Sequence, residues 1–303
     1  MGVVSNKADE KQSRGQLEMI ELTSESLYDH PRIYDLLFGS DWKAEFDFLL
    51  AAFDKFPGRR VQSVFEPACG TGRLLFKLAQ KGYEVSGNDL NAKAVRFCNQ
   101  RLIRHGFGPT ALVGDMSCFS LPVKVDAAFN LINSFRHLHS EAAALAHLRS
   151  MADNLAPGGL YVLGLHLTPA GACQCSRESW SARRGHLAAT LRMWSIDVNR
   201  RARRERFGMA IDVYTPLKQF RLTEEVVFRT YTAGQFRRLL AHVPELELIE
   251  TFDFAYDIER PVRLDGNTED VVFVIRRRAG ERCIRYTGKR TEHSAQRPVD
   301  HLP

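Results

Sequence analysis

The stretch Phe65–Arg73, "FEPACGTGR", places two glycines, Gly70 and Gly72, in a tight turn directly after a short apolar run. A buried strand that ends in a glycine-rich turn and continues into a helix is typical of a nucleotide-binding unit. The turn is not a P-loop, because no Gly-Lys-Ser/Thr follows it. The dinucleotide fingerprint has a third glycine where Leu75 stands, so the two glycines alone do not identify the nucleotide.

Glu66, four residues before the first glycine, narrows the choice of ligand. A pyrophosphate bound at a helix N-terminus is anionic, and a carboxylate at the head of its loop would repel it. A ligand with a cationic sulfonium and an α-ammonium group would instead be attracted. Glu66 therefore favours S-adenosylmethionine as the cofactor.

Acidic residues also follow the next two predicted strands. Asp89 ends the second strand, where its carboxylate can accept hydrogen bonds from both ribose hydroxyls, with Leu90 beside the adenine face. Asp115 and Met116 end the third strand, where the carboxylate can accept from the adenine amino group and the thioether can pack against the ring. Because the carboxyl ends of parallel strands meet at one edge of a sheet, these side chains predict a nucleoside site there.

Strands alternate with helices through the first half of the chain, which is typical of βαβ units. We therefore expect an α/β fold with a doubly wound, mostly parallel, seven-stranded Rossmann-like sheet. From Thr168 to about Arg229 the hydrophobic pattern changes to period two, which predicts an inserted small antiparallel sheet. The strands predicted for the main sheet are 60–67, 83–90, 110–115, 125–133, 160–167, 246–257 and 269–277.

This pattern divides the chain into five segments. We expect a flexible leader at 1–20, a cofactor-binding core with N-terminal helices at 21–167 and an inserted sheet that acts as a lid at 168–229. Residues 230–278 complete the core sheet, and 279–303 form a disordered basic tail.

The net charge of +6 is concentrated at the C-terminal end. Residues 276–303 hold eight Lys or Arg against three Asp or Glu, which is +5 of the total. The nearly neutral remainder argues against nucleic acid as a partner. No apolar run reaches the length of a membrane helix, no signal peptide is evident, and the six cysteines are scattered. We expect a cytoplasmic protein without membrane contact, as a monomer or a homodimer.

The chain from about Leu27 to Arg277 resembles the class I S-adenosylmethionine-dependent methyltransferases. The motifs that carry the resemblance are "VFEPACGTGRLLFKLA", "EVSGNDLN", "GDM" and "LAPGGLYVLGLHL". The resemblance implies the methyltransferase fold and S-adenosylmethionine as cofactor. It also adds Tyr34, Ala68 and Asn130 to the cofactor-binding residues Glu66, Gly70, Gly72, Asp89, Leu90, Asp115 and Met116.

Three segments narrow the acceptor. "YDHPRIYDLLFG", "NLINSFRHL" and the late strand insertion are similar to small-molecule members of the family, especially sugar amine and amino N-methyltransferases. This implies methylation of a small molecule at nitrogen, with oxygen second. Two alternatives remain: an RNA or protein methyltransferase that uses the basic run 199–208 and the tail, and a non-catalytic sensor of S-adenosylmethionine.

Two histidines at the carboxyl edge of the fourth and fifth strands, His137 and His166, are the candidate catalytic residues. A hydroxyl acceptor needs a general base, whereas an amine needs only to lose its own proton. Cys173 and Cys175 form at most half of a zinc site with a nearby histidine, so we expect no metal.

Overall fold

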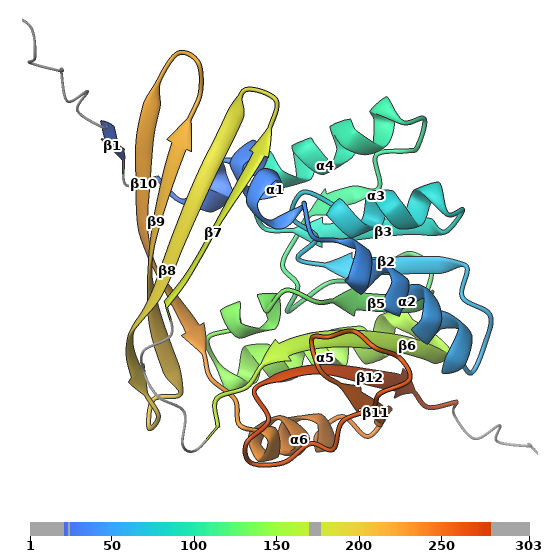
Figure 1. The fold of residues 1–303 in the computed structure, drawn as a ribbon. Coiled ribbons are helices and arrows are strands. Elements are labelled where there is room, and N and C mark those ends of the chain that lie inside the picture. Colours follow the sequence, from blue (N-terminus) through green and yellow to red (C-terminus); the bar gives the residue numbers. More distant parts are fainter. Residues whose placement is uncertain (1–20, 24, 170–176, 280–303) are drawn as a thin grey trace, which may run out of the picture.

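The structure, a computed structural model, describes residues 21–23, 25–169 and 177–279 (Figure 1). The predicted leader at 1–20 lies outside this part of the chain. So do all but the first residue of the predicted tail and both Cys173 and Cys175.

A seven-stranded sheet forms the centre of the fold, in the order β11-β12-β6-β5-β2-β3-β4. All neighbouring strands are parallel except where β12 pairs antiparallel with β11 and with β6. The predicted fold class, a doubly wound and mostly parallel seven-stranded sheet, is therefore confirmed. The strands are β2 (Ser63–Pro67), β3 (Glu84–Asp89), β4 (Ala111–Val113), β5 (Val125–Asn130), β6 (Leu155–His166), β11 (Leu246–Phe252) and β12 (Asp270–Arg277).

Helices cover both faces of this sheet, each through an apolar stripe. The side chains of α2 (Lys43–Lys55), α3 (Arg73–Gln80) and α4 (Ala92–Arg104) pack into one core cluster with strand residues such as Val64 and Phe129. On the other face, α5 (Glu141–Asn154) and α6 (Ala233–Ala241) pack against residues such as Phe65 and Tyr161. Alternate residues of the buried strands thus supply two cores, as the pleat requires.

A second, five-stranded sheet has the order β1-β10-β9-β8-β7. Its antiparallel strands confirm the predicted insertion, but two members were not predicted. The strand β7 has the polar sequence "RESWSARR", and β1 pairs parallel with β10 although it lies before the core in sequence. The strands are β1 (Glu21–Thr23), β7 (Arg177–Arg184), β8 (Leu187–Asn199), β9 (Arg204–Tyr214) and β10 (Gln219–Arg229).

The five-stranded sheet lies beside the carboxyl edge of the core sheet (Figure 1). The short helix η2 (Ser134–His137) follows β5 at that edge, and its Arg136 forms a buried ion pair of 2.7 Å with Glu205 of β9. The helix α1 (Pro31–Phe38) packs Ile33, Leu36 and Leu37 into the apolar core of the second sheet. Both elements join the sheet to the edge where the predicted site residues lie.

The strand β6 begins five residues earlier than predicted. The predicted strand starts at Leu160, whereas β6 starts at Leu155 and includes the "LAPGG" that follows α5. A register shift against β5 accommodates the extra residues. A side chain at Gly159 would come within 2.8 Å of the carbonyl oxygen of Asp126, so glycine is needed where the strand enters the sheet.

The glycine turn allows a sharp test of how tightly it is packed. Gly72 has φ +65°, and a Cβ there would overlap the thiol of Cys98 on α4. Gly82 has φ +94°, and a Cβ there would meet no atom within 4 Å. We expect Gly72→Ala to lower the free energy of unfolding by about 3 kcal/mol or more, combining backbone strain with overpacking.

Gly82→Ala is the matched control, because it carries the backbone strain alone, about 1–2 kcal/mol. Urea denaturation of both variants measures the difference. Equal losses of unfolding free energy in the two variants would mean that the turn is not closely packed against α4 at Gly72.

Candidate functional site

The carboxylate of Asp89 holds the glycine turn from the neighbouring strand. Its Oδ2 accepts from the backbone N–H of Gly70 at 2.8 Å, and its Oδ1 accepts from the backbone N–H of Asn91 at 2.8 Å. Burial raises the pKa of Asp89, and the two backbone hydrogen bonds oppose this rise. Each oxygen keeps a second lone pair, so the carboxylate can accept two further hydrogen bonds.

Asn88, which the sequence analysis did not select, connects three parts of the site. Its side-chain oxygen accepts from the N–H of Ala68, which has φ +53°, and its carbonyl accepts from Cys69 at 2.8 Å. Its side-chain amide donates to the carbonyl of Asp115 at 3.3 Å. The strand end of β3 therefore sets the positions of the turn after β2 and the loop after β4.

Two buried oxygens next to the turn have no hydrogen-bond partner in the described residues: Glu66 Oε2 and Asn130 Oδ1. Asn130 donates to the carbonyl of Pro67 at 2.7 Å, which places it beside Glu66. Burial raises the pKa of Glu66 well above its usual range, and the guanidinium of Arg73 offsets part of that rise. Unsatisfied buried acceptors cost free energy unless a donor satisfies them, so this pair is suited to a cationic donor.

The other predicted cofactor residues surround the same turn. The ring of Tyr34, on α1, lies 3.8 Å from where a side chain at Gly70 would begin, and burial raises its pKa to about 12. Leu90 is 71% exposed and Asp115 is also exposed, whereas Met116 is buried. The predicted residues of β2, β3, β4 and β5 therefore line one edge of the sheet.

Met116 is held by a histidine that the sequence analysis did not select. Burial lowers the pKa of His147 to about 4, so its ring is neutral. Its Nδ1 donates to the carbonyl of Met116 at 2.7 Å, and its Nε2 accepts from the hydroxyl of Tyr161 at 2.8 Å. The loop after β4 is thus fixed from the hydrophobic core below it.

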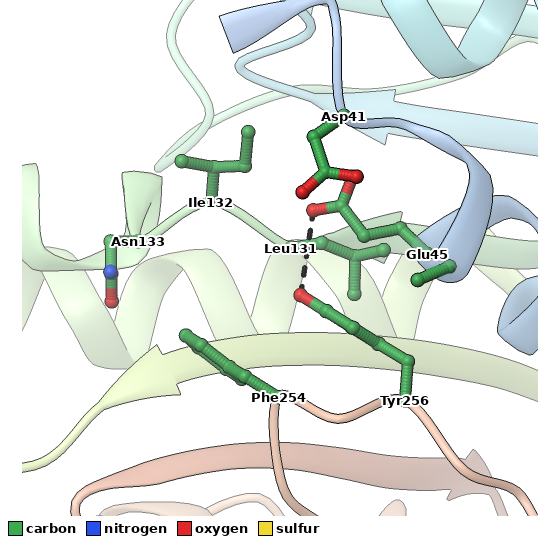
Figure 2. A pocket seen from close by; sticks show the side chains of 8 residues that line it. Asp41, Glu45, Leu131, Ile132, Asn133, Phe254 and Tyr256 are labelled. Atoms are coloured by element: carbon green, nitrogen blue, oxygen red, sulfur yellow. Dashed lines mark hydrogen bonds between the residues drawn. The ribbon is translucent and has the colours of Figure 1, made fainter. Parts of the chain in front are cut away.

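Residues 131–133, which directly follow Asn130 in the chain, line a pocket of about 290 Å³ (Figure 2). The carboxylates of Asp41 and Glu45 point toward each other at one side, and the rings of Phe254 and Tyr256 form the opposite wall. These two rings are nearly parallel, with centroids 5.8 Å apart. The complete lining is Asp41, Ala44, Glu45, Leu131, Ile132, Asn133, Phe254 and Tyr256.

Glu45 connects this pocket to the glycine turn. It forms an ion pair with Arg73, the residue after Gly72, and accepts a 3.4 Å hydrogen bond from the hydroxyl of Tyr256. Burial, followed by the charge of Glu45, raises the pKa of Tyr256. The hydroxyl therefore stays protonated and remains a donor at neutral pH.

The two candidate catalytic histidines lie in different surroundings. The Nε2 of His137 is 3.1 Å from the hydroxyl of Tyr28, and burial lowers the pKa of His137 to about 4. The Nδ1 of His166 is 2.6 Å from Asp270, and its backbone N–H donates to Asn133 of the pocket. Thus His166 borders the acidic pocket, whereas His137 lies beneath β10, with its ring centroid 4.9 Å from that of Phe228.

The basic run 199–208 forms the turn between β8 and β9 and the first part of β9. Arg203 pairs with Glu141 at 2.5 Å, and Arg206 pairs with Asp197 at 2.6 Å. Within the described ranges there is no metal-binding cluster of His, Cys, Asp and Glu. No helix in that part of the chain is long and apolar enough to cross a membrane.

Part of the chain that contains the glycine turn is similar to known proteins. Residues 64–159 match the methyltransferase domain. A 140-residue stretch is 29% identical to the dTDP-3-amino-3,4,6-trideoxy-α-D-glucopyranose N,N-dimethyltransferase of Streptomyces venezuelae. It covers 45% of this chain and 56% of that enzyme, so the chain spans little more than half the length of this relative.

Two of the similar solved structures share the fold over at least 98% of their own length. An S-adenosylmethionine-dependent methyltransferase of Clostridium acetobutylicum has a TM-score of 0.67 at 16% identity, covering 82% of this chain and 98% of its own. The S-adenosylmethionine-bound amino pentose methyltransferase of Micromonospora echinaspora has a TM-score of 0.62 at 21% identity, covering 84% and 100%. Residues 64–159 thus match the methyltransferase domain, and the chain shares the fold of these S-adenosylmethionine-dependent methyltransferases.

Proposed function

We propose that this chain transfers the methyl group of S-adenosylmethionine to an amino nitrogen of a small molecule. The observation that carries the proposal is the pair of unsatisfied buried oxygens, Glu66 Oε2 and Asn130 Oδ1, at the glycine turn. A ligand with an α-ammonium group satisfies both, and a pyrophosphate satisfies neither.

The rest of the turn fits the nucleoside half of this cofactor. The free lone pairs of Asp89 accept from the two ribose hydroxyls, and exposed Leu90 offers an apolar face for adenine. Asp115 accepts from the adenine amino group. When bound, S-adenosylmethionine supplies a methyl group on a positively charged sulfur. The positive charge makes this sulfur a good leaving group.

The acidic pocket is the proposed acceptor site. Residues 131–133 line it and directly follow Asn130, so it adjoins the cofactor's amino-acid end. Carboxylates and aromatic faces together attract a protonated amine, through charge and cation–π interactions. The chain's task is then positioning, because a neutral nitrogen held in line with the methyl carbon needs little further assistance.

The proton released by the amine requires a place to go. Asp41 is exposed and lies in the pocket, so it can pass this proton to solvent. Glu45 is already paired with Arg73 and serves to hold the pocket wall. A carboxylate on one side and aromatic rings on the other leave the nitrogen lone pair free to face the methyl group.

An oxygen acceptor is the second candidate, and one observation favours it. His166 is paired through Nδ1 with Asp270, which leaves Nε2 as a candidate base next to Asn133 of the pocket. The RNA alternative is less favoured, because Arg203 and Arg206 of the basic run are already paired with carboxylates.

The charge state of Glu66 gives a test of the cofactor site. Because burial raises the pKa of Glu66, this side chain stays partly protonated at pH values where an ordinary carboxylic acid is fully ionised. A bound ammonium favours the ionised form of Glu66 and lowers its pKa, so binding releases a proton. Affinity for S-adenosylmethionine therefore rises with pH between the pKa of Glu66 in the bound protein and its pKa in the free protein. Calorimetry of S-adenosylmethionine binding in buffers of different ionisation enthalpy measures the released proton.

Glu66→Gln should abolish this proton release, and Glu84→Gln should preserve it. Glu84 is exposed at the amino end of β3 and serves as the control. Unchanged proton release in Glu66→Gln would place the ammonium group elsewhere.

Turnover tests the acceptor class. We expect label from methyl-labelled S-adenosylmethionine to reach the amino group of a dTDP-amino sugar, or of another small amine from a metabolite extract, as identified by mass spectrometry. Asp41→Asn should raise the acceptor KM about tenfold or more, the loss of one charge-assisted interaction, without changing cofactor affinity.

Asp47→Asn is the control, because Asp47 lies on α2 outside the pocket and pairs with Lys43. Label on a hydroxyl oxygen would favour the second candidate, and label on RNA or protein would contradict the small-molecule proposal. Cofactor binding without transfer to any acceptor would identify a sensor instead.

A further inference from the structure

Asp35 on α1 joins three separate elements through one buried carboxylate. Its side chain is 2% exposed. Oδ1 accepts from Thr71 of the glycine turn at 3.1 Å and pairs with Arg101 of α4 at 2.5 Å. Oδ2 pairs with Arg184, at the end of β7 in the second sheet, at 2.7 Å. None of these contacts belongs to the proposed cofactor or acceptor contacts.

Thr71 is held through its side-chain hydroxyl and through its backbone carbonyl. Its hydroxyl donates to Asp35, and its carbonyl accepts from Nη1 of Arg101 at 3.2 Å. It lies between Gly70 and Gly72, whose φ angles of +52° and +65° leave the backbone few restraints of its own. The ion pair of Asp35 with Arg101 therefore holds Thr71, the residue between the two glycines, in position.

Arg184 brings the second sheet into this arrangement. It ends β7, an edge strand whose last residues approach α1 (Figure 1). A second contact lies four residues earlier, where Nε1 of Trp180 donates to the carbonyl of Leu37 at 3.2 Å. The edge of the second sheet is thus attached to the helix that carries Asp35.

Two guanidinium groups share the charge of one carboxylate here. Burial raises the pKa of Asp35, but the hydrogen bonds and charges of Arg101 and Arg184 outweigh burial and hold it below its usual value. Asp35 is therefore ionised at neutral pH. Without Arg184, the carboxylate keeps the ion pair with Arg101 and the hydrogen bond from Thr71 but loses its contact with β7.

We propose that Asp35 is a positioning residue for the glycine turn and that Arg184 couples the order of β7 to the geometry of that turn. The coupling is reciprocal, so a ligand that fixes the turn also fixes the β7–β8 hairpin. We call the contacts from Arg184 through Asp35 to Thr71 the tether. The assignment of that ligand as S-adenosylmethionine rests on the proposed function, but the tether itself does not.

Hydrogen exchange of the full chain without ligand tests the tether. In Arg184→Gln, the backbone N–H groups of Gly70 and Gly72 should exchange about fivefold faster than in the wild type, as expected for the loss of a coupling of ordinary size. These two N–H groups bond Asp89 and the carbonyl of Cys69, so they report directly on the turn.

Arg183→Gln is the matched control. Arg183 is the preceding residue and is exposed, and among the described residues its side chain donates only within the hairpin, to the carbonyl of Gly185. It should leave exchange at the turn unchanged. Equal exchange in both variants, or an equal acceleration in both, would overturn the proposal.

A second measurement separates this inference from the proposed function. Wild-type affinity for S-adenosylmethionine tests the cofactor site, and Arg184→Gln should reduce that affinity about fivefold while Arg183→Gln leaves it unchanged. If the wild type does not bind S-adenosylmethionine but the exchange result holds, the proposed function fails and the tether stands. If the wild type binds and exchange is unaffected, the tether fails alone.

Discussion

The hydrogen bond from the backbone N–H of Gly70 to Asp89 is the contact on which the site depends. It joins the turn after β2 to the end of β3, and its 2.8 Å length is that of a charge-assisted bond. Asn88 reinforces the same junction through Ala68 and Cys69. A turn with two left-handed glycines has many conformations when free, so a partner on the next strand must select one.

Charge determines what such a turn can bind. The N-terminus of a helix and its preceding N–H groups ordinarily attract anions. Here Glu66 and Asp89 occupy the same edge, and the N–H of Gly70 is already used by Asp89. Asp41 places a further carboxylate in the neighbouring pocket, next to that of Glu45, which is paired with Arg73. The edge is therefore suited to the cationic groups of the proposed reaction: a sulfonium with an ammonium, and an amine.

Much of this arrangement could be read from the sequence because it depends on position within a strand. Asp89 and Asn130 end their strands and Glu66 is the last residue but one of β2, and the carboxyl ends of parallel strands meet at one edge. Apolar runs identify such strands, so the seven-stranded core was predictable. The polar strand β7 carries no such pattern and depends on pairing with β8 and on α1 for its existence.

The residues that the sequence did not reveal act across long separations. Asp35 reaches Arg184 across 149 positions, and Glu45 meets Tyr256 across 211. Asp270 pairs with His166 only because β12 returns antiparallel to β6. Local patterns hold no information about such contacts, which depend on the completed topology. The most direct test of the whole account is a crystal structure with S-adenosylhomocysteine. We predict both ribose hydroxyls on Asp89 and the α-ammonium on Glu66 Oε2 and Asn130 Oδ1. A ligand bound away from the glycine turn, or bound there with its amino group pointing away from Glu66, would contradict it.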